Sequence, residues 1–215
     1  MRRKGFDQYC GLARALELIG ERWALLIIRE LLAHPGRYTD LLEELPGIPT
    51  NVLSTRLKEL EEAGIVERRI APAPQRGVLY VLTKAGESLE GAVLALALWG
   101  NGQLGDYQSE DRVPPSSLAL ALRATFNRDA ASELTASWEI RAGRAALHAV
   151  VTDGHLTSGT GPAPSEPDLV ITVPGDAVPP YREIMQAIKT GEVELSGPPS
   201  LLDTFALVFT PPAVQ

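Results

Sequence analysis

The sequence has a single cysteine, Cys10, and only three histidines, His34, His148 and His155, among its 215 residues. One cysteine excludes an internal disulfide framework and a cysteine-cluster zinc site, and the scattered histidines do not have the spacing of metal ligands. The longest apolar run, 92–99, is far shorter than a membrane span, and no apolar signal core follows the basic start. We therefore expect a cytoplasmic protein with no membrane partner, no metal and no cofactor.

The sequence also lacks a catalytic set. No nucleophile motif accompanies His148 and His155, and Asp153 and Asp168 do not have the spacing of an acid–base pair. The composition, with 45% hydrophobic and 22% charged residues, is that of an ordinary globular protein. We expect a folded protein that is not an enzyme.

The formal net charge of −7 is unusual for a protein that binds DNA. The first 112 residues carry 14 Lys+Arg and 16 Asp+Glu, whereas the remaining 103 carry 6 and 11, so most of the acidity lies in the second half. DNA binding requires a local basic face rather than a basic protein. The charge count permits a DNA-binding first half but does not by itself favour one.

Hydrophobic periodicity and turn residues divide the first half into helices and two strands. The order is four helices, two short strands and a long helix, expected at residues 12–19, 23–33, 39–44, 50–63, 65–71, 78–82 and 84–103. Thr39, Thr50 and Thr83 are the expected caps of the third, fourth and last of these helices. Helix, tight turn, helix and then two strands joined by a loop is the order of a winged helix-turn-helix.

A polar stretch rich in turn formers, GDYQSEDRVPPSS at 105–117, has the composition of a domain linker. We expect an N-terminal domain at 1–104 and a second domain at 118–215. The second domain is expected to be α+β, with Asp153-Gly154 as a hairpin turn and a helix that starts at Asp176. Its other elements are a helix at 118–126, strands at 134–140, 145–151, 169–173 and 192–196, and a helix at 201–208.

The helix expected at 50–63 has two different faces. Leu53, Leu57 and Leu60 fall on one face and predict a core contact, while polar residues fall on the opposite face. Asparagine can read adenine, hydroxyls can serve bases or phosphates, and cations can neutralise phosphates. The candidate DNA-binding residues are Thr50, Asn51, Ser54, Thr55, Arg56, Lys58 and Arg76, the last at the tip of the loop between the strands. Arg68 and Arg69, on the strand before that loop, could help Arg76 to reach the backbone or the minor groove. The alternative is an ordinary solvated helix face.

Ordered residues from about position 10 to 102 resemble the HxlR family of winged helix regulators. The matching stretches include Cys10, Ile19-Gly20, Arg22-Trp23, Arg37-Tyr38-Thr39-Asp40-Leu41, Gly47-Ile48-Pro49, Leu53-Ser54, Arg56-Leu57-Lys58, Gly64-Ile65-Val66, Arg68, Tyr80 and Leu82-Thr83. The resemblance implies sequence-specific binding of double-stranded DNA by a homodimer joined through its terminal helices. Leu89, Val93, Leu96 and Trp99 would form the contact here, unless they pack only within one chain or against the second domain. The family often has Phe, Glu and Ser at the positions of Tyr38, Asp40 and Pro49, so the base preference is not implied.

Cys10 matches a position that senses oxidants or electrophiles in several regulators of this family. Such sensing needs a thiolate, which nearby positive charge or a helix N-terminus favours. Cys10 is expected near the start of the first helix, close in sequence to basic residues. The alternative is that Cys10 is a small, buried apolar residue.

Residues from about 117 to 209 resemble the sterol-carrier-protein-2-like fold. The resemblance rests on the strand pair around Asp153-Gly154, the strand 169–173 and the helices and short strand that follow it. It implies an apolar tunnel that takes a hydrophobic small molecule, lined here by Trp138, Met185, Phe205 and Phe209. The alternative is that these residues close a solid core.

Two functions remain open from the sequence. The first is a homodimeric, sequence-specific transcriptional regulator that responds to a hydrophobic small molecule or to thiol modification. The second is a lipid-carrier or protein-interaction module whose winged helix serves only dimerisation.

Overall fold

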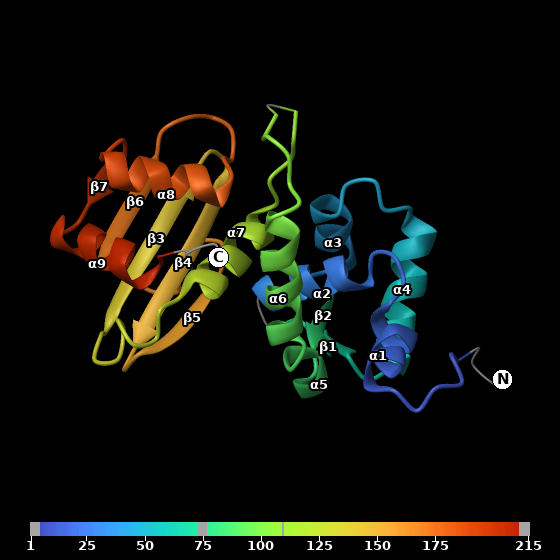
Figure 1. Cartoon of the computed structure of the whole chain (residues 1–215). Coiled ribbons are helices and arrows are strands. Elements are labelled where there is room, and N and C mark those ends of the chain that lie inside the picture. Colours follow the sequence, from blue (N-terminus) through green and yellow to red (C-terminus); the bar gives the residue numbers. More distant parts are fainter. Residues whose placement is uncertain (1–4, 73–76, 109, 211–215) are drawn as a thin grey trace. The chain divides into compact units, whose positions relative to one another are not determined.

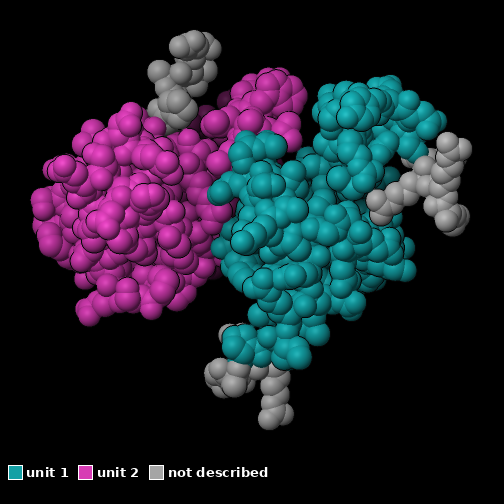
Figure 2. Space-filling model, turned by 90° about the horizontal axis from the view of Figure 1, so that it is seen from below, with its two compact units in different colours: residues 1–93 teal, residues 94–215 magenta. Residues whose placement is uncertain are grey.

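The computed structural model describes residues 5–72, 77–108 and 110–210. The chain divides into two compact units, Met1–Val93 and Leu94–Gln215, which are coloured separately in Figure 2. Within the described ranges, no helix is both long enough and apolar enough to cross a membrane.

The first unit is a bundle of helices with a two-stranded wing (Figure 1). Its elements are α1 (Gly11–Ile19), α2 (Ala24–Ala33), α3 (Tyr38–Glu44), α4 (Thr50–Glu62), β1 (Val66–Ile70), β2 (Val78–Leu82) and α5 (Lys84–Glu87). α6 (Glu90–Asn101) follows and extends past the boundary between the units. β1 and β2 pair antiparallel, with Val66 opposite Leu82 and Ile70 opposite Val78. The first unit therefore has the element order of a winged helix-turn-helix.

The caps of α3 and α4 lie one or two residues earlier than the sequence predicted. α3 begins at Tyr38, so Thr39 lies inside the helix, and the Asp40 carboxylate accepts the backbone N–H of Arg37 at 2.9 Å instead. α4 begins at Thr50, and the extended residue before it is Pro49. Thr50 is therefore the first helical residue, and Pro49, whose φ is fixed by its ring, is the extended residue before the helix.

The long helix predicted over 84–103 is interrupted after its first turn. Thr83 caps α5 as expected, and its Oγ1 accepts the N–H of Gly86 at 3.2 Å. A Cβ on Gly86 would lie 2.3 Å from the Ile65 carbonyl oxygen, so only glycine permits this close approach of α5 to the start of β1. Ser88 donates to the Ala85 carbonyl at 2.7 Å, and this local hydrogen bond accompanies the break before α6.

The second unit contains a five-stranded sheet (Figure 1). Its elements are α7 (Pro115–Thr125), β3 (Ala136–Ala142), β4 (Ala145–Thr152), β5 (His155–Thr160), β6 (Leu169–Val173), α8 (Tyr181–Thr190), β7 (Glu194–Ser196) and α9 (Ser200–Val208). The strand order is β5-β4-β3-β6-β7, with β3 and β6 parallel and the other neighbours antiparallel. Figure 1 shows α8 and α9 over one face of the sheet. The second unit is α+β, as predicted.

In the second unit, the structure confirms one predicted turn and moves the start of one predicted helix. Asp153 and Gly154 both have positive φ, 48° and 74°, and they join β4 to β5 as the expected hairpin turn. The helix expected from Asp176 instead begins at Tyr181, and Pro180 is the extended residue before it. The prolines lie ahead of the first helical turn because their preceding residues favour extended backbone.

Candidate nucleic-acid interface

The two predicted faces of α4 are present in the structure. Leu53, Leu57 and Leu60 are buried, with exposed fractions of 0, 2 and 1%. Asn51 and Thr55 lie on the opposite side of the helix and are exposed. The leucines hold α4 against the core, so the polar side is available to a partner.

The hydroxyls of α4 are turned toward its own backbone. Thr55 Oγ1 donates to the Asn51 carbonyl at 2.8 Å, and Ser54 Oγ donates to the Thr50 carbonyl at 3.0 Å. Each hydroxyl therefore presents lone pairs to an incoming ligand while its proton is engaged. Across the described ranges, no hydrogen bond holds the Asn51 side-chain amide, which can both donate and accept.

The cations predicted on α4 lie in different settings. The Lys58 side chain is 75% exposed, and its Nζ is 4.0 Å from a Glu62 carboxylate oxygen. The Arg56 side chain is only 19% exposed and forms ion pairs with Glu21, at 3.2 Å, and with Glu59. Arg56 therefore lies on the flank that joins α4 to the segment before α2, and its predicted phosphate contact stays a prediction.

Two further sequence candidates lie away from α4. Arg76 is outside the described residues, and its predicted contact is untested. Cys10 is exposed and stands directly before α1. Its nearest described basic neighbour in sequence, Arg14, directs its guanidinium to Glu17 at 2.9 Å. Cys10 is therefore not the buried apolar residue of the alternative interpretation.

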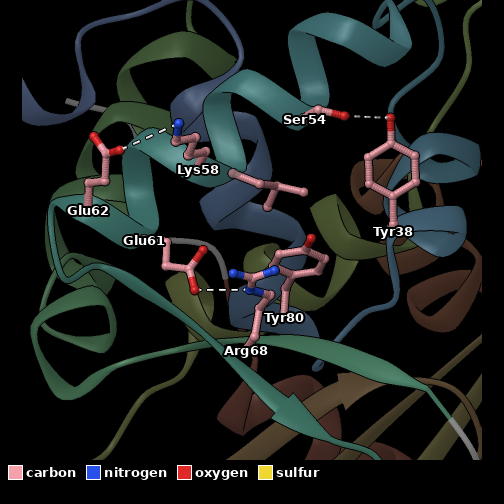
Figure 3. Close-up of a pocket in the computed structure, with 8 residues that line it drawn as sticks. Tyr38, Ser54, Lys58, Glu61, Glu62, Arg68 and Tyr80 are labelled. Atoms are coloured by element: carbon pink, nitrogen blue, oxygen red, sulfur yellow. Dashed lines mark hydrogen bonds and ion pairs between the residues drawn. The ribbon is translucent and has the colours of Figure 1, made fainter.

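A cleft of about 380 Å³ lies between α4, the start of α3 and the wing, and Figure 3 shows it. Its lining residues are Tyr38, Ser54, Leu57, Lys58, Glu61, Glu62, Arg68 and Tyr80. Arg68 and Tyr80 face each other across β1 and β2 in the strand register. Lys58 borders both the cleft and the exposed polar side of α4, so the two surfaces are continuous.

The charged side chains of this cleft lie on one side of it, and the hydroxyls of Tyr38 and Ser54 lie on the other (Figure 3). The Arg68 Nε donates to Glu61 at 3.0 Å, and this hydrogen bond and the charge of Glu61 raise the pKa of the Arg68 guanidinium. On the opposite wall, the Tyr38 hydroxyl donates to the Thr50 carbonyl at 2.7 Å and lies 3.2 Å from Ser54 Oγ. The sequence predicts that Arg68 helps Arg76 to reach the DNA backbone, but it does not predict this cleft. Strand alternation places Arg68 on the same face as Val66 and Ile70.

The four predicted pocket residues of the second unit pack in its core. Trp138, Met185, Phe205 and Phe209 are at most 3% exposed. The Trp138 ring lies 5.8 Å from Phe205 and 6.0 Å from Phe209, and the two phenylalanine rings are 4.6 Å apart. These contacts are those of a closely packed core, and a ligand tunnel among these side chains stays a prediction.

Comparison with known proteins places the first unit in a family. The model of the HxlR-like helix-turn-helix family matches residues 18–108. The helix-turn-helix transcriptional regulator YodB of Bacillus subtilis is 38% identical over 87 residues, which cover 40% of this chain and 78% of YodB. A helix-turn-helix transcriptional regulator of Mycobacterium tuberculosis is 40% identical over 105 residues, which cover 49% of this chain and 63% of that protein.

Two solved structures are also similar to this chain in sequence. The quinone-bound structure of YodB from Bacillus subtilis is 34% identical and has a TM-score of 0.37, covering 42% of this chain and 96% of that one. The redox regulator HypR in its reduced form is 29% identical and has a TM-score of 0.41, covering 44% and 93%. The family match and the identity to YodB over most of its length agree with the winged helix described above. The chain belongs to the HxlR-like family of DNA-binding helix-turn-helix transcriptional regulators.

Proposed function

We propose that the protein is a homodimeric, sequence-specific regulator that places one α4 from each subunit in the major groove of double-stranded DNA. One observation carries the proposal: Asn51, Thr55 and Lys58 stand exposed on the side of α4 opposite its buried leucines. Two α4 helices related by a two-fold axis match two half-sites about one helical turn apart, which is the usual geometry of helix-turn-helix dimers.

Each exposed side chain of α4 has its own chemistry toward DNA. The Asn51 amide can donate and accept at once, which suits the N6 and N7 edge of adenine. The lone pairs of Thr55 can accept from an amino group of a base. The Lys58 ammonium can contact phosphates or guanine, and the Thr50 and Ser54 hydroxyls would lie near the DNA backbone at the edge of the major groove. Arg76, which lies between β1 and β2 in the sequence, is proposed to reach the backbone or the minor groove.

Exposed apolar side chains support the proposed dimer. Leu12 and Leu16, on α1, are 69 and 47% exposed, and Leu96 and Trp99, on α6, are 51 and 70% exposed. Each pair of exposed apolar side chains, taken by itself, is suited to a contact with a second subunit. Val93, which the sequence assigned to this contact, is 6% exposed and instead packs within the chain.

The second unit is proposed to be a sterol-carrier-protein-2-like domain. The linker predicted at 105–117 would end in the first turn of α7, which begins at Pro115. The support is the helix-covered sheet and the hairpin at Asp153-Gly154, together with the sequence resemblance. A hydrophobic ligand among Trp138 and its ring neighbours would have to displace side chains that already touch. Calorimetric titration with a panel of lipids tests this part of the proposal, and a result in which no lipid binds would count against it.

The regulator is also proposed to act in the cytoplasm and to respond to modification of Cys10. The support for a thiol response is exposure of the cysteine and its place directly before α1. Modification there would alter a helix that carries the exposed apolar residues Leu12 and Leu16, and so the proposed dimer.

The chain offers a closely matched experiment for DNA binding. The triple variant Asn51→Ala, Thr55→Ala, Lys58→Ala removes an amide, a hydroxyl and a cation from α4. Its control removes the same groups from α8, where Gln186, Lys189 and Thr190 are exposed. Thr190 Oγ1 donates to the Gln186 carbonyl at 3.1 Å, just as Thr55 donates to Asn51.

Genomic fragments that the purified wild-type protein retains provide the duplex for this test. We expect the α4 variant to lose specific binding in a fluorescence anisotropy titration, and the α8 variant to bind like the wild type. Equal binding by all three proteins would instead favour a carrier or interaction module in which the winged helix only mediates dimerisation.

A further inference from the structure

The cleft between α4 and the wing carries two cations and two carboxylates within one small space. Its cations are Lys58 and Arg68, and its carboxylates are Glu61 and Glu62 (Figure 3). The Arg68 Nε lies 3.0 Å from a Glu61 oxygen, whereas Lys58 and Glu62 are 4.0 Å apart. Each of the two cations of the cleft thus has a carboxylate beside it.

The position of the cleft indicates which anion its cations would meet. A helix in the major groove and a wing beside it lie on either side of a phosphodiester backbone, which passes between them. The cleft lies between these two elements, and Lys58 belongs to both its wall and the exposed side of α4. Arginine presents a planar fork of donors that matches phosphate as well as carboxylate.

We propose that this cleft binds one backbone phosphate of the DNA through Arg68 and Lys58, and that the Glu61 carboxylate occupies the place of that phosphate in the free protein. The inference rests on the proposed function, since it concerns DNA held by α4. On binding, Arg68 exchanges Glu61 for the phosphate, and Ser54 Oγ, on the opposite wall of the cleft, can turn its proton toward a phosphate oxygen. The carboxylate lowers affinity for every duplex alike, because phosphates carry no sequence information.

This exchange also accounts for the charge of the first unit. Residues 1–93 carry 13 Lys+Arg and 13 Asp+Glu, so the unit that binds DNA is formally neutral. Non-specific affinity depends almost entirely on cations that meet phosphates. Carboxylates that hold those cations in the free protein restrain such binding, and discrimination then depends more on the bases that Asn51 and Thr55 reach.

A double-mutant cycle on Glu61 and Arg68 tests the exchange. The probe is a mixed-sequence duplex of about 30 base pairs, long enough for two half-sites one turn apart. We expect Arg68→Gln to weaken binding about tenfold, as for loss of a hydrogen bond to a charged group. The variant should also lower the slope of log K against log salt by about one. Glu61→Gln should tighten binding about twofold to fivefold, the range of an exposed ion pair.

The cycle separates exchange from simple repulsion. If Glu61 acts by holding Arg68, Glu61→Gln has no effect once Arg68 is Gln. Equal tightening in both backgrounds would overturn the proposal, because Glu61 would then repel DNA through space without occupying a site. Glu87→Gln, the same change on α5 at an exposed position, is the matched control and should leave binding unchanged.

Two further measurements keep the outcomes distinct. Arg68→Lys keeps the positive charge but loses the planar fork of donors, so it should bind DNA with intermediate affinity and the salt slope of the wild type. The thermal midpoint of each variant is the second measurement, because a folding defect would lower it as well as the affinity. If the wild-type protein binds no duplex, the proposed function fails. If the wild type binds and the α4 triple variant does not, but Arg68→Gln binds like the wild type, only the phosphate site fails.

Discussion

Tyr38 and Thr50 join the first turns of two helices through one hydrogen bond. The Tyr38 hydroxyl, on α3, donates to the Thr50 carbonyl, on α4, at 2.7 Å. Ser54 Oγ lies 3.0 Å from the same carbonyl and 3.2 Å from the tyrosine oxygen. The hydroxyl that distinguishes Tyr38 from phenylalanine therefore fixes where the proposed recognition helix begins.

Replacing Tyr38 by phenylalanine should lower the free energy of unfolding by about 1 kcal/mol, the usual net value of one hydrogen bond. The loss is moderate because Ser54 still donates to the Thr50 carbonyl. Urea unfolding measures it. Tyr80→Phe is the control, since across the described ranges no hydrogen bond engages the Tyr80 hydroxyl on the other side of the cleft. A Tyr80→Phe loss as large as that of Tyr38→Phe would contradict this assignment.

Local sequence signals were sufficient for most of the fold. The leucines of α4 repeat at helical spacing, and their burial in the structure follows directly from that period. Asp153-Gly154 specifies its hairpin because both positions require positive φ. The errors are at helix ends, where a few residues compete. Asp40 rather than Thr39 takes part in the cap of α3, by accepting the N–H of Arg37, and the two neighbours cannot be distinguished by type alone.

The site was less accessible to sequence reasoning, because its contacts are not local. Arg68 and Glu61 are seven residues apart and lie on different elements, so the strand direction after Gly64 decides whether they meet. Arg56, predicted as a phosphate contact, is a second case of a contact that is not local. Glu21, which lies before α2, pairs with it on the flank of α4. Only the packing of α4 against neighbouring segments determines which polar residues remain exposed.

Glu139 should make the second unit sensitive to acid. Burial by itself would raise the pKa of this carboxyl, but the Ala163 N–H, the Arg141 guanidinium and the charge of His148 bring the pKa below its usual value. A carboxyl whose folded pKa is depressed stabilises the fold above its unfolded pKa, about 4.3. That stability is lost as the pH falls through the folded pKa.

The measurement is the thermal midpoint of the wild type and of Glu139→Gln from pH 7 downward. We expect the wild type to lose stability more steeply than the variant below pH about 4.3, because the glutamine cannot bind a proton. The control is Glu133→Gln, at an exposed position in the same unit. Parallel profiles for Glu139→Gln and the wild type would show that the carboxylate makes no net contribution.

Phe205 tests whether the second unit has a filled core or a ligand tunnel. The ring lies against Trp138 and Phe209 and is 1% exposed, so Phe205→Ala should cost about 3–5 kcal/mol through lost burial and a new cavity. Leu207→Ala, on the same helix but 61% exposed, should cost less than about 0.5 kcal/mol. Urea unfolding compares them. A small loss for Phe205→Ala would indicate that the ring borders an existing space, as the tunnel requires.

Cys10 should be reactive if the proposed thiol response is present. Because the thiol is exposed, we expect an alkylating reagent to label the native protein about as fast as the unfolded chain. Diamide should then weaken DNA binding by the wild type but not by Cys10→Ser. The serine variant without diamide is the control for the substitution itself. If diamide weakens both proteins equally, the response does not pass through Cys10.

Arg56 and Lys58 provide a direct comparison between a packed cation and an exposed one on the same helix. Arg56 is held by Glu21 and Glu59, and its Nε is buried, so Arg56→Gln should lower the free energy of unfolding by about 1–2 kcal/mol. Because two ion pairs hold this guanidinium and its side chain is only 19% exposed, whereas that of Arg68 is 56% exposed, we expect the salt dependence of DNA binding to stay unchanged.

Lys58→Gln should behave in the opposite way. Its side chain is 75% exposed, so stability should change by less than about 0.5 kcal/mol, whereas the salt slope should fall by about one for a lost phosphate contact. Urea unfolding and anisotropy titrations at several salt concentrations measure both quantities for both variants. If Arg56→Gln also lowers the salt slope, Arg56 leaves its carboxylates when DNA binds, and the phosphate contact predicted from the sequence is present after all.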